Sequence, residues 1–241
     1  MNLAGSKASS TFLGLALVSW VLVGIAAPSC GGGSVIEETA DGGTDGGGSS
    51  EPIVETLKPG ADPLPGETEC SVVMTTGIPV APATHVPFCT EVTYATNPPS
   101  GGDHWKEWAA FKEYSTAIRR EIYVHDMEHG AVVLVYKCAD ACPEVVQMLR
   151  DVVAEATSDP LCVQAGGTAA RLVITPDPEL DTPIAAAAWG ATYTATCIDK
   201  ASLAAFVTKV YGKGPEATCY PGKDPTDPSS GIPTCEGSTG N

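Results

Sequence analysis

Residues 131–136 read AVVLVY, an unbroken apolar run rich in β-branched valine. A run of this length without polar alternation is typical of a β-strand that is covered on both faces, because a half-exposed strand alternates apolar and polar residues. The sequence therefore predicts a sheet with other parts of the chain packed on both of its sides.

A helix is predicted shortly after this strand. Pro143 occupies a position suited to the first turn of a helix, where the missing N–H of proline has no intrahelical partner to lose. Apolar residues then recur along one helical face through about residue 156, namely Val145, Val146, Leu149, Val152 and Val153.

More strands and a second helix follow. Residues 171–175 read as a strand, and residues 184–189 and 191–197 read as one or two further strands with a bend at Gly190. Asp199 is suited to cap a last helix that ends near Gly212. The apolar face of this helix consists of Leu203, Phe206, Val207 and Val210.

The part of the chain before the first strand is rich in prolines and loops. Only residues 72–75 and 92–94 suggest short extended pieces there. The resulting order of strands and helices favours the α+β class. We expect one folded domain over residues 67–216, a small mixed β-sheet with two packed helices and a loop-rich N-terminal half. An irregular tail over residues 217–241 follows it.

The N-terminus has the features of an export signal. Residues 12–27 form an apolar run of 16 residues, shorter than the ~20 that a spanning helix needs, so residues 1–29 are interpreted as a signal peptide. The sequence before Cys30 resembles a bacterial lipobox, which predicts lipidation at Cys30. Plain secretion and a retained membrane anchor are the alternatives.

The stretch that follows Cys30 supports the lipoprotein interpretation. Residues 30–66 are acidic and rich in glycine, a composition typical of a flexible tether. The expected partner is therefore a membrane, reached through a lipid anchor on an exported cell-envelope protein. Gly31 directly after Cys30 favours the outer membrane over retention at the inner one.

The cysteine count indicates disulfides. Of nine cysteines, eight remain after Cys30 is set aside, and an even number in an exported chain is typical of a disulfide set. They are Cys70, Cys89, Cys138, Cys142, Cys162, Cys197, Cys219 and Cys235. Their spacing leaves about a hundred pairings open, although a Cys219–Cys235 bridge would suit the tail. A redox role for Cys138 and Cys142 is a weaker alternative, because their CxxxC spacing differs from that of thiol oxidoreductases.

The charge balance argues against one class of partner. The formal net charge is −16, and the sequence contains no run of lysines and arginines. An acidic surface repels the phosphate backbone, so nucleic-acid binding is not expected.

Four histidines lie within a short part of the chain. His104 follows a rigid Pro/Gly turn, and His125 and His129 lie directly before the buried strand. Converging imidazoles suit zinc or copper. We therefore predict a metal site at His104, His125 and His129, with His85 as a candidate fourth ligand and Glu128 behind them, orienting a ligand.

Other interpretations of the same residues remain open. The imidazoles could form a buried hydrogen-bond network with Glu128 and Asp126, or serve acid–base chemistry. The string HDMEH also fits the HxxEH pattern of inverted zinc peptidases. That pattern requires a long helix, whereas Gly130 and a strand follow here at once, so the peptidase interpretation is disfavoured.

The sequence resembles the bacterial domain of unknown function family 3105. The matching pieces are His85-Val86, NPPSGGDHW at residues 97–105, VHDMEHGAVVLVY at residues 124–136 and the segment from Thr182 to Gly190. The resemblance spans roughly residues 84–216 and implies an exported or membrane-anchored protein. Asp103 and Met127 depart from the usual residues of this family, and Cys219 and Cys235 are additions.

The resemblance brings no activity with it, so three functions remain. The first is a cell-envelope module that binds a metal or small ligand at the histidines. The second is a structural or interaction domain without a ligand site. The third is a metal-dependent hydrolase with Glu128 as general base, although no serine-nucleophile motif accompanies it.

Overall fold

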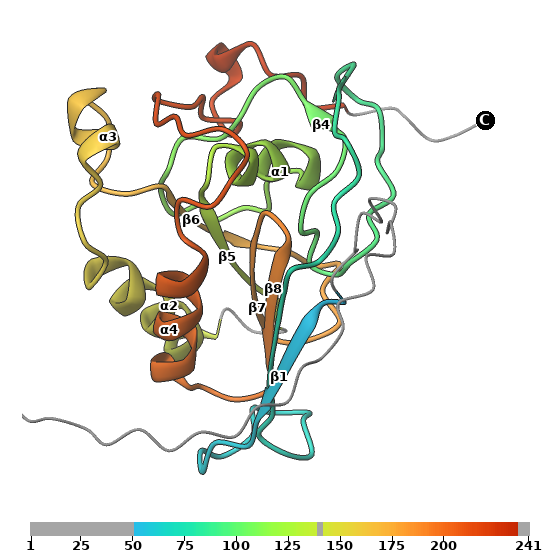
Figure 1. Ribbon diagram of the computed structural model, residues 1–241, viewed down its shortest axis with the longest axis vertical. Helices are drawn as coiled ribbons and strands as arrows, with labels where there is room; N and C mark the ends of the chain where they lie inside the picture. Colours follow the sequence, from blue (N-terminus) through green and yellow to red (C-terminus); the bar gives the residue numbers. More distant parts are fainter. Residues whose placement is uncertain (1–50, 139–141, 236–241) are drawn as a thin grey trace, which may run out of the picture. The chain divides into compact units, whose positions relative to one another are not determined.

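The computed structural model describes residues 51–138 and 142–235. A six-stranded mixed sheet forms the centre of this part, in the order β1-β2-β8-β7-β5-β6 (Figure 1). Only β5 and β6 run parallel; the other neighbours are antiparallel. The strands are β1 (Ile53–Leu57), β2 (Val72–Thr76), β5 (Val132–Tyr136), β6 (Leu172–Pro176), β7 (Ile184–Ala188) and β8 (Ala191–Ala195). The predicted mixed sheet of an α+β fold is confirmed.

The strand β5 is covered on both faces, as its composition predicts. Its side chains from Val132 to Val135 are fully buried. Val132 and Leu134 belong to a core shared with α2 (Pro143–Ala154) and α4 (Lys200–Val210), which lie side by side (Figure 1). Val133 and Val135 belong to a second core on the opposite face, which contains α1 (Arg120–Glu128).

The two predicted helices are present, but the described residues contain four. The additional ones are α1 and the short α3 (Pro160–Gln164), and a 3-10 turn η1 spans Pro228–Ser230. Every side chain from Glu121 to Met127 is buried, including charged ones. Because α1 lies between the sheet and loops, it has no apolar stripe facing a polar one, and periodicity does not reveal it.

Two expectations for the N-terminal half are wrong. The tether predicted over residues 30–66 extends too far, because Ile53–Leu57 within it pairs with Val72–Thr76 as an edge strand of the sheet. Residues 92–94 form no strand; the N–H of Val92 instead donates to the carboxylate of Glu121. The predicted signal peptide and the predicted lipidation site, Cys30, lie outside the described residues. Among the residues described, no helix is both long and apolar enough to cross a membrane.

Four disulfides join the eight cysteines, in the pairs Cys70–Cys197, Cys89–Cys235, Cys138–Cys142 and Cys162–Cys219. The presence of a disulfide set is therefore confirmed. The expected Cys219–Cys235 bridge is wrong, since each partner is bonded to an earlier part of the chain. The tail is irregular up to residue 235, apart from η1, yet it is packed on the domain, with Cys219 and Ile232 buried.

Candidate metal centre

Three separate elements bring the histidines together. The short strands β3 (His85–Val86) and β4 (His104–Trp105) pair in parallel, with His85 opposite His104. The helix α1 supplies His125 and Glu128, which are three residues apart and therefore lie on one helical face. Trp105 of β4 is fully buried in the same core as α1 and holds this strand against the helix.

The resulting group contains three imidazoles and one carboxylate. One donor atom from each of His85, His104, His125 and Glu128 lies within 4.8 Å of the others. Glu128 Oε2 is 3.1 Å from His104 Nε2 and 3.9 Å from His125 Nε2. Because metal–ligand bonds are about 2 Å long, the donors of a tetrahedral site lie roughly 3.3 Å apart, so small side-chain rotations would complete a coordination shell. Glu128 is thus among the donor atoms and not behind them.

Backbone carbonyls fix the orientation of two rings. The Nδ1 of His104 lies 2.8 Å from the oxygen of Gly102, and the Nδ1 of His125 lies 2.8 Å from the oxygen of Trp105. A carbonyl oxygen only accepts, so each Nδ1 carries the proton and donates. In the neutral ring, the lone pair is therefore on Nε2, which faces Glu128. Metal-binding histidines are commonly held in this way.

The environment keeps His125 neutral. Burial, together with the nearby rings of His104 and His129, lowers the pKa of His125 from 6.5 to about 3. The Nε2 atom of His104 is buried and lacks a hydrogen-bond partner among the described residues, although it lies close to Glu128. A carboxylate and unprotonated imidazole nitrogens therefore face one another, an arrangement that a cation would stabilise.

His129 belongs to a neighbouring group. Its Nε2 lies 3.2 Å from Oε2 of Glu216, and a second set of donor atoms within 4.8 Å consists of Glu128, His129 and Glu216. The predicted set of His104, His125 and His129 therefore does not share one group. His104 and His125 lie in the first group and His129 lies in the second, while Glu128 belongs to both. Asp126, which the network alternative includes, is in neither group; burial raises its pKa well above the usual range.

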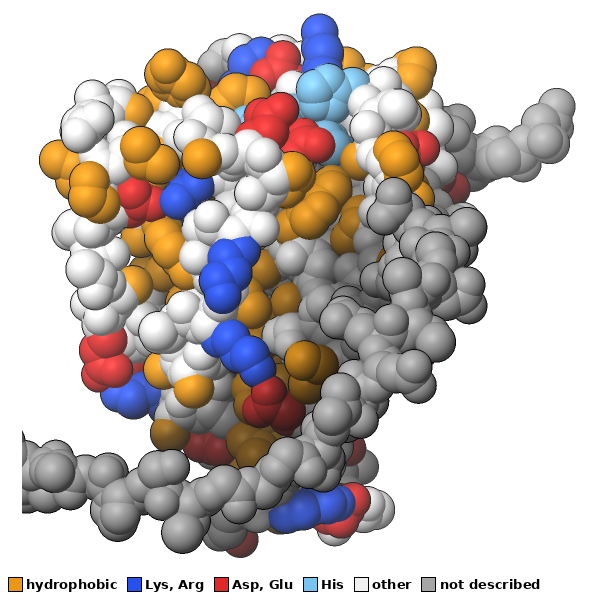
Figure 2. Space-filling view, viewed as in Figure 1, with side chains coloured by type: hydrophobic (Ala, Val, Ile, Leu, Met, Phe, Trp, Pro, Cys, Tyr) orange, Lys and Arg blue, Asp and Glu red, His pale blue; other side chains and the backbone are white. Residues whose placement is uncertain are grey.

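The sequence gives no sign of two residues that complete the centre. Glu216 lies after α4 in an irregular segment, and its N–H donates to the Glu128 carbonyl oxygen over 3.0 Å. The indole of Trp108 packs against His125 and His129, with ring centroids 5.1 and 4.6 Å away. Neither residue lies in a motif, so contacts between distant segments alone identify them. Figure 2 shows histidine side chains at the surface with acidic side chains beside them.

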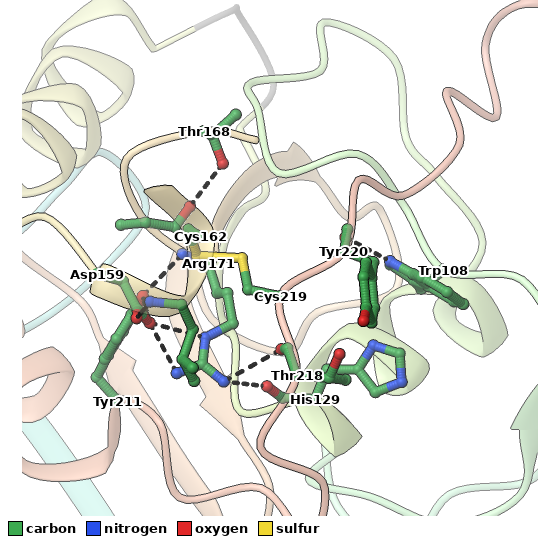
Figure 3. Close-up of a disulfide and its surroundings, with 12 residues drawn as sticks. Trp108, His129, Asp159, Cys162, Thr168, Arg171, Tyr211, Thr218, Cys219 and Tyr220 are labelled. Carbon is green, nitrogen blue, oxygen red and sulfur yellow. Dashed lines mark hydrogen bonds and ion pairs between the residues drawn. A yellow bond between two sulfur atoms is a disulfide. The ribbon is translucent and has the colours of Figure 1, made fainter. Parts of the chain in front are cut away.

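A buried ion pair supports the end of α1. Arg171 pairs with Asp159 over 2.8 Å and donates to the backbone oxygens of His129 and Thr218. The neighbouring Cys162–Cys219 disulfide ties the same tail segment to α3. Figure 3 shows that the His129 imidazole points away from the Arg171 guanidinium. Arg171 thus holds the backbone of the site without facing its donor atoms.

The comparison with known proteins gives a family but no activity. A family described as "Protein of unknown function (DUF3105)" matches residues 85–221, which include both groups of donor atoms. No curated protein and no solved structure matches the chain.

Proposed function

We propose that this chain, which belongs to the DUF3105 family of proteins of unknown function, binds a divalent transition-metal ion. The ligands would be His85, His104, His125 and Glu128. One observation carries the proposal: the four donor atoms lie within 4.8 Å of one another. The two best-buried rings offer Nε2 to this group because their Nδ1 atoms are bonded to backbone carbonyls.

The ligand chemistry favours zinc or copper. Imidazole nitrogen suits both metals, and one carboxylate beside three histidines leaves the first coordination shell without sulfur. The eight domain cysteines are joined in disulfides, so thiolate ligation does not compete. The protein contributes a neutral His125, which can bind the metal without first releasing a proton near neutral pH.

We further propose that the protein acts at the cell envelope, tethered through Cys30. The support for this location is the apolar leader, the cysteine after it and the glycine-rich acidic stretch that follows. Such a tether would leave the metal centre facing an oxidising compartment, which agrees with the four disulfides.

The proposal is tested on the purified full chain by elemental analysis and by calorimetric titration with Zn²⁺ and Cu²⁺. We expect binding in wild type that is abolished in His104→Ala/His125→Ala. The matched control is Glu91→Gln, which changes an exposed carboxylate outside both groups and should bind as wild type. Binding no tighter than millimolar in wild type, together with strong destabilisation of the double variant, would show that the histidines are structural.

A further inference from the structure

We propose that the centre holds two divalent cations, with Glu128 as the carboxylate between them. The second cation would be bound by Glu128, His129 and Glu216. This inference rests on the proposed metal function and extends it, because it assigns a second ion to residues outside the first group.

The shared carboxylate is the main argument. Glu128 belongs to both groups of donor atoms, and within each group the donors lie no more than 4.8 Å apart. A carboxylate has two oxygens and several lone pairs, so it can ligate one ion with each oxygen. Metal ions bridged in two-metal sites are typically ~3.5–4 Å apart, a spacing that fits groups joined by one side chain. The rings of His125 and His129, one from each group, have centroids 4.6 Å apart.

The environment of His129 is an independent observation. Only 4% of its side chain is exposed, and its Nδ1 has no hydrogen-bond partner within the described part of the chain. Its Nε2 faces Glu216. Unlike His104 and His125, this ring is not fixed by a backbone carbonyl, and the edge-on contact with Trp108 holds it in place instead. A cation beside Glu216 would therefore be bound by Nε2 of a buried ring that Trp108 holds in position.

The two ions would differ in their access to solvent. The first group offers four protein donors, the number that a closed tetrahedral zinc site uses. The second offers three, and 57% of the Glu216 side chain is exposed. The second ion would therefore keep a position for water or a small anionic ligand. A water bound there would become more acidic, as in metal centres that supply a nucleophile.

The charges are compatible with two ions. The two carboxylates offset half of the charge of two divalent cations, and a bound hydroxide would reduce the remainder. The positive charge of Arg171 is already paired with Asp159, and the His129 ring points away from it (Figure 3).

The test is the metal stoichiometry of the full chain, measured by elemental analysis after Zn²⁺ titration. We expect two equivalents in wild type and in Glu91→Gln, and one equivalent in Glu216→Gln and in His129→Gln. Loss of a ligand should weaken the second equivalent by at least about 100-fold, more than loss of an outer hydrogen bond typically does. Glu216→Gln keeps the size of a largely exposed side chain, so it tests the site without a change in folding.

A spectroscopic measurement gives a second readout. With two equivalents of Cu²⁺, electron paramagnetic resonance of wild type should show spin coupling, whereas Glu216→Gln should show one isolated Cu²⁺. One equivalent in wild type, unchanged by Glu216→Gln, would overturn the second site and leave the proposed function intact. No tight binding in wild type would overturn the proposed function itself. Two equivalents that persist in both variants would place the second ion elsewhere and also overturn this inference.

Discussion

The guanidinium of Arg171 donates to the backbone oxygen of His129, the residue that follows the last turn of α1. This contact joins the start of β6 to the end of the helix that carries His125 and Glu128. Both Arg171 and its partner Asp159 are almost fully buried, and Tyr211 also donates to Asp159. Site geometry thus depends on a polar cluster that does not itself face the donor atoms.

Replacement of Arg171 should therefore be strongly destabilising. In Arg171→Leu, Asp159 would remain buried without its cation, and such a loss typically costs about 3–5 kcal/mol of unfolding free energy. Urea denaturation of the metal-free protein measures this. Lys58→Met is the matched control, because it breaks an exposed ion pair with Glu69 and should change stability little. Equal effects of the two substitutions would contradict this role of Arg171.

Gly214 allows the segment that carries Glu216 to approach α1. A Cβ at this position would overlap the carbonyl oxygen of Glu128 and the nitrogen of Gly130. Both are backbone atoms, so no change of side-chain rotamer can relieve the clash. We expect Gly214→Ala to lower the melting temperature and to weaken metal binding that needs Glu216. Gly60→Ala, where no atom lies within 4 Å of the added carbon, should leave both unchanged. If Gly214→Ala has the melting temperature and the metal binding of wild type, the close packing is refuted.

His125 should make the metal-free protein sensitive to acid. Its pKa is about 3 in the folded protein against 6.5 ordinarily, so between these values the unfolded chain binds a proton that the folded chain does not. The stabilisation is complete above pH 6.5 and is lost as the pH falls toward 3. In His125→Asn, whose amide can still donate to the Trp105 carbonyl, the slope of unfolding free energy against pH should fall by up to about one proton. Denaturant titrations with a chelator at several pH values measure this slope, and identical slopes would contradict the shift.

The disulfides should differ in their contributions to stability. Cys162–Cys219 spans 57 residues of sequence, whereas Cys138–Cys142 spans 4. The entropy of loop closure predicts stabilisation of roughly 4 kcal/mol for the first and roughly 2 kcal/mol for the second. Double serine replacements, compared by denaturation, measure the difference. Because Cys219 lies near Glu216, loss of the long bridge should also weaken binding of the second cation, and loss of the short one should not.

Cys30 should determine where the protein is found. If it is lipidated, the full chain expressed in a bacterial host will partition into the detergent phase, and Cys30→Ser will move to the aqueous phase. Two acyl signals are needed for stable anchoring, so the intact mass of the detergent-phase protein should begin at a modified Cys30. A wild-type protein in the aqueous phase with a different N-terminus would contradict this prediction.

Local patterns in the sequence determined much of the secondary structure. The continuous apolar run at residues 131–136 predicted the buried strand, and helical spacing of apolar residues predicted α2 and α4, because each pattern records which side of an element is covered. The even cysteine count predicted disulfide bridges. The closeness of the four histidines in the sequence identified four of the donor residues, with Glu128 expected behind them. These features depend on neighbours within a few positions.

Only the tertiary structure decided how these parts meet. The buried helix α1, the pairing of His85 with His104, the disulfide partners and the place of Glu216 all result from contacts between distant segments. The division of the histidines into two groups around Glu128 has the same origin. His125 and His129 are close in sequence, yet which donor each ring faces depends on β4 and on the segment after α4. A local pattern carries no information on those contacts, because the free energy that selects them comes from burial and pairing across the whole domain.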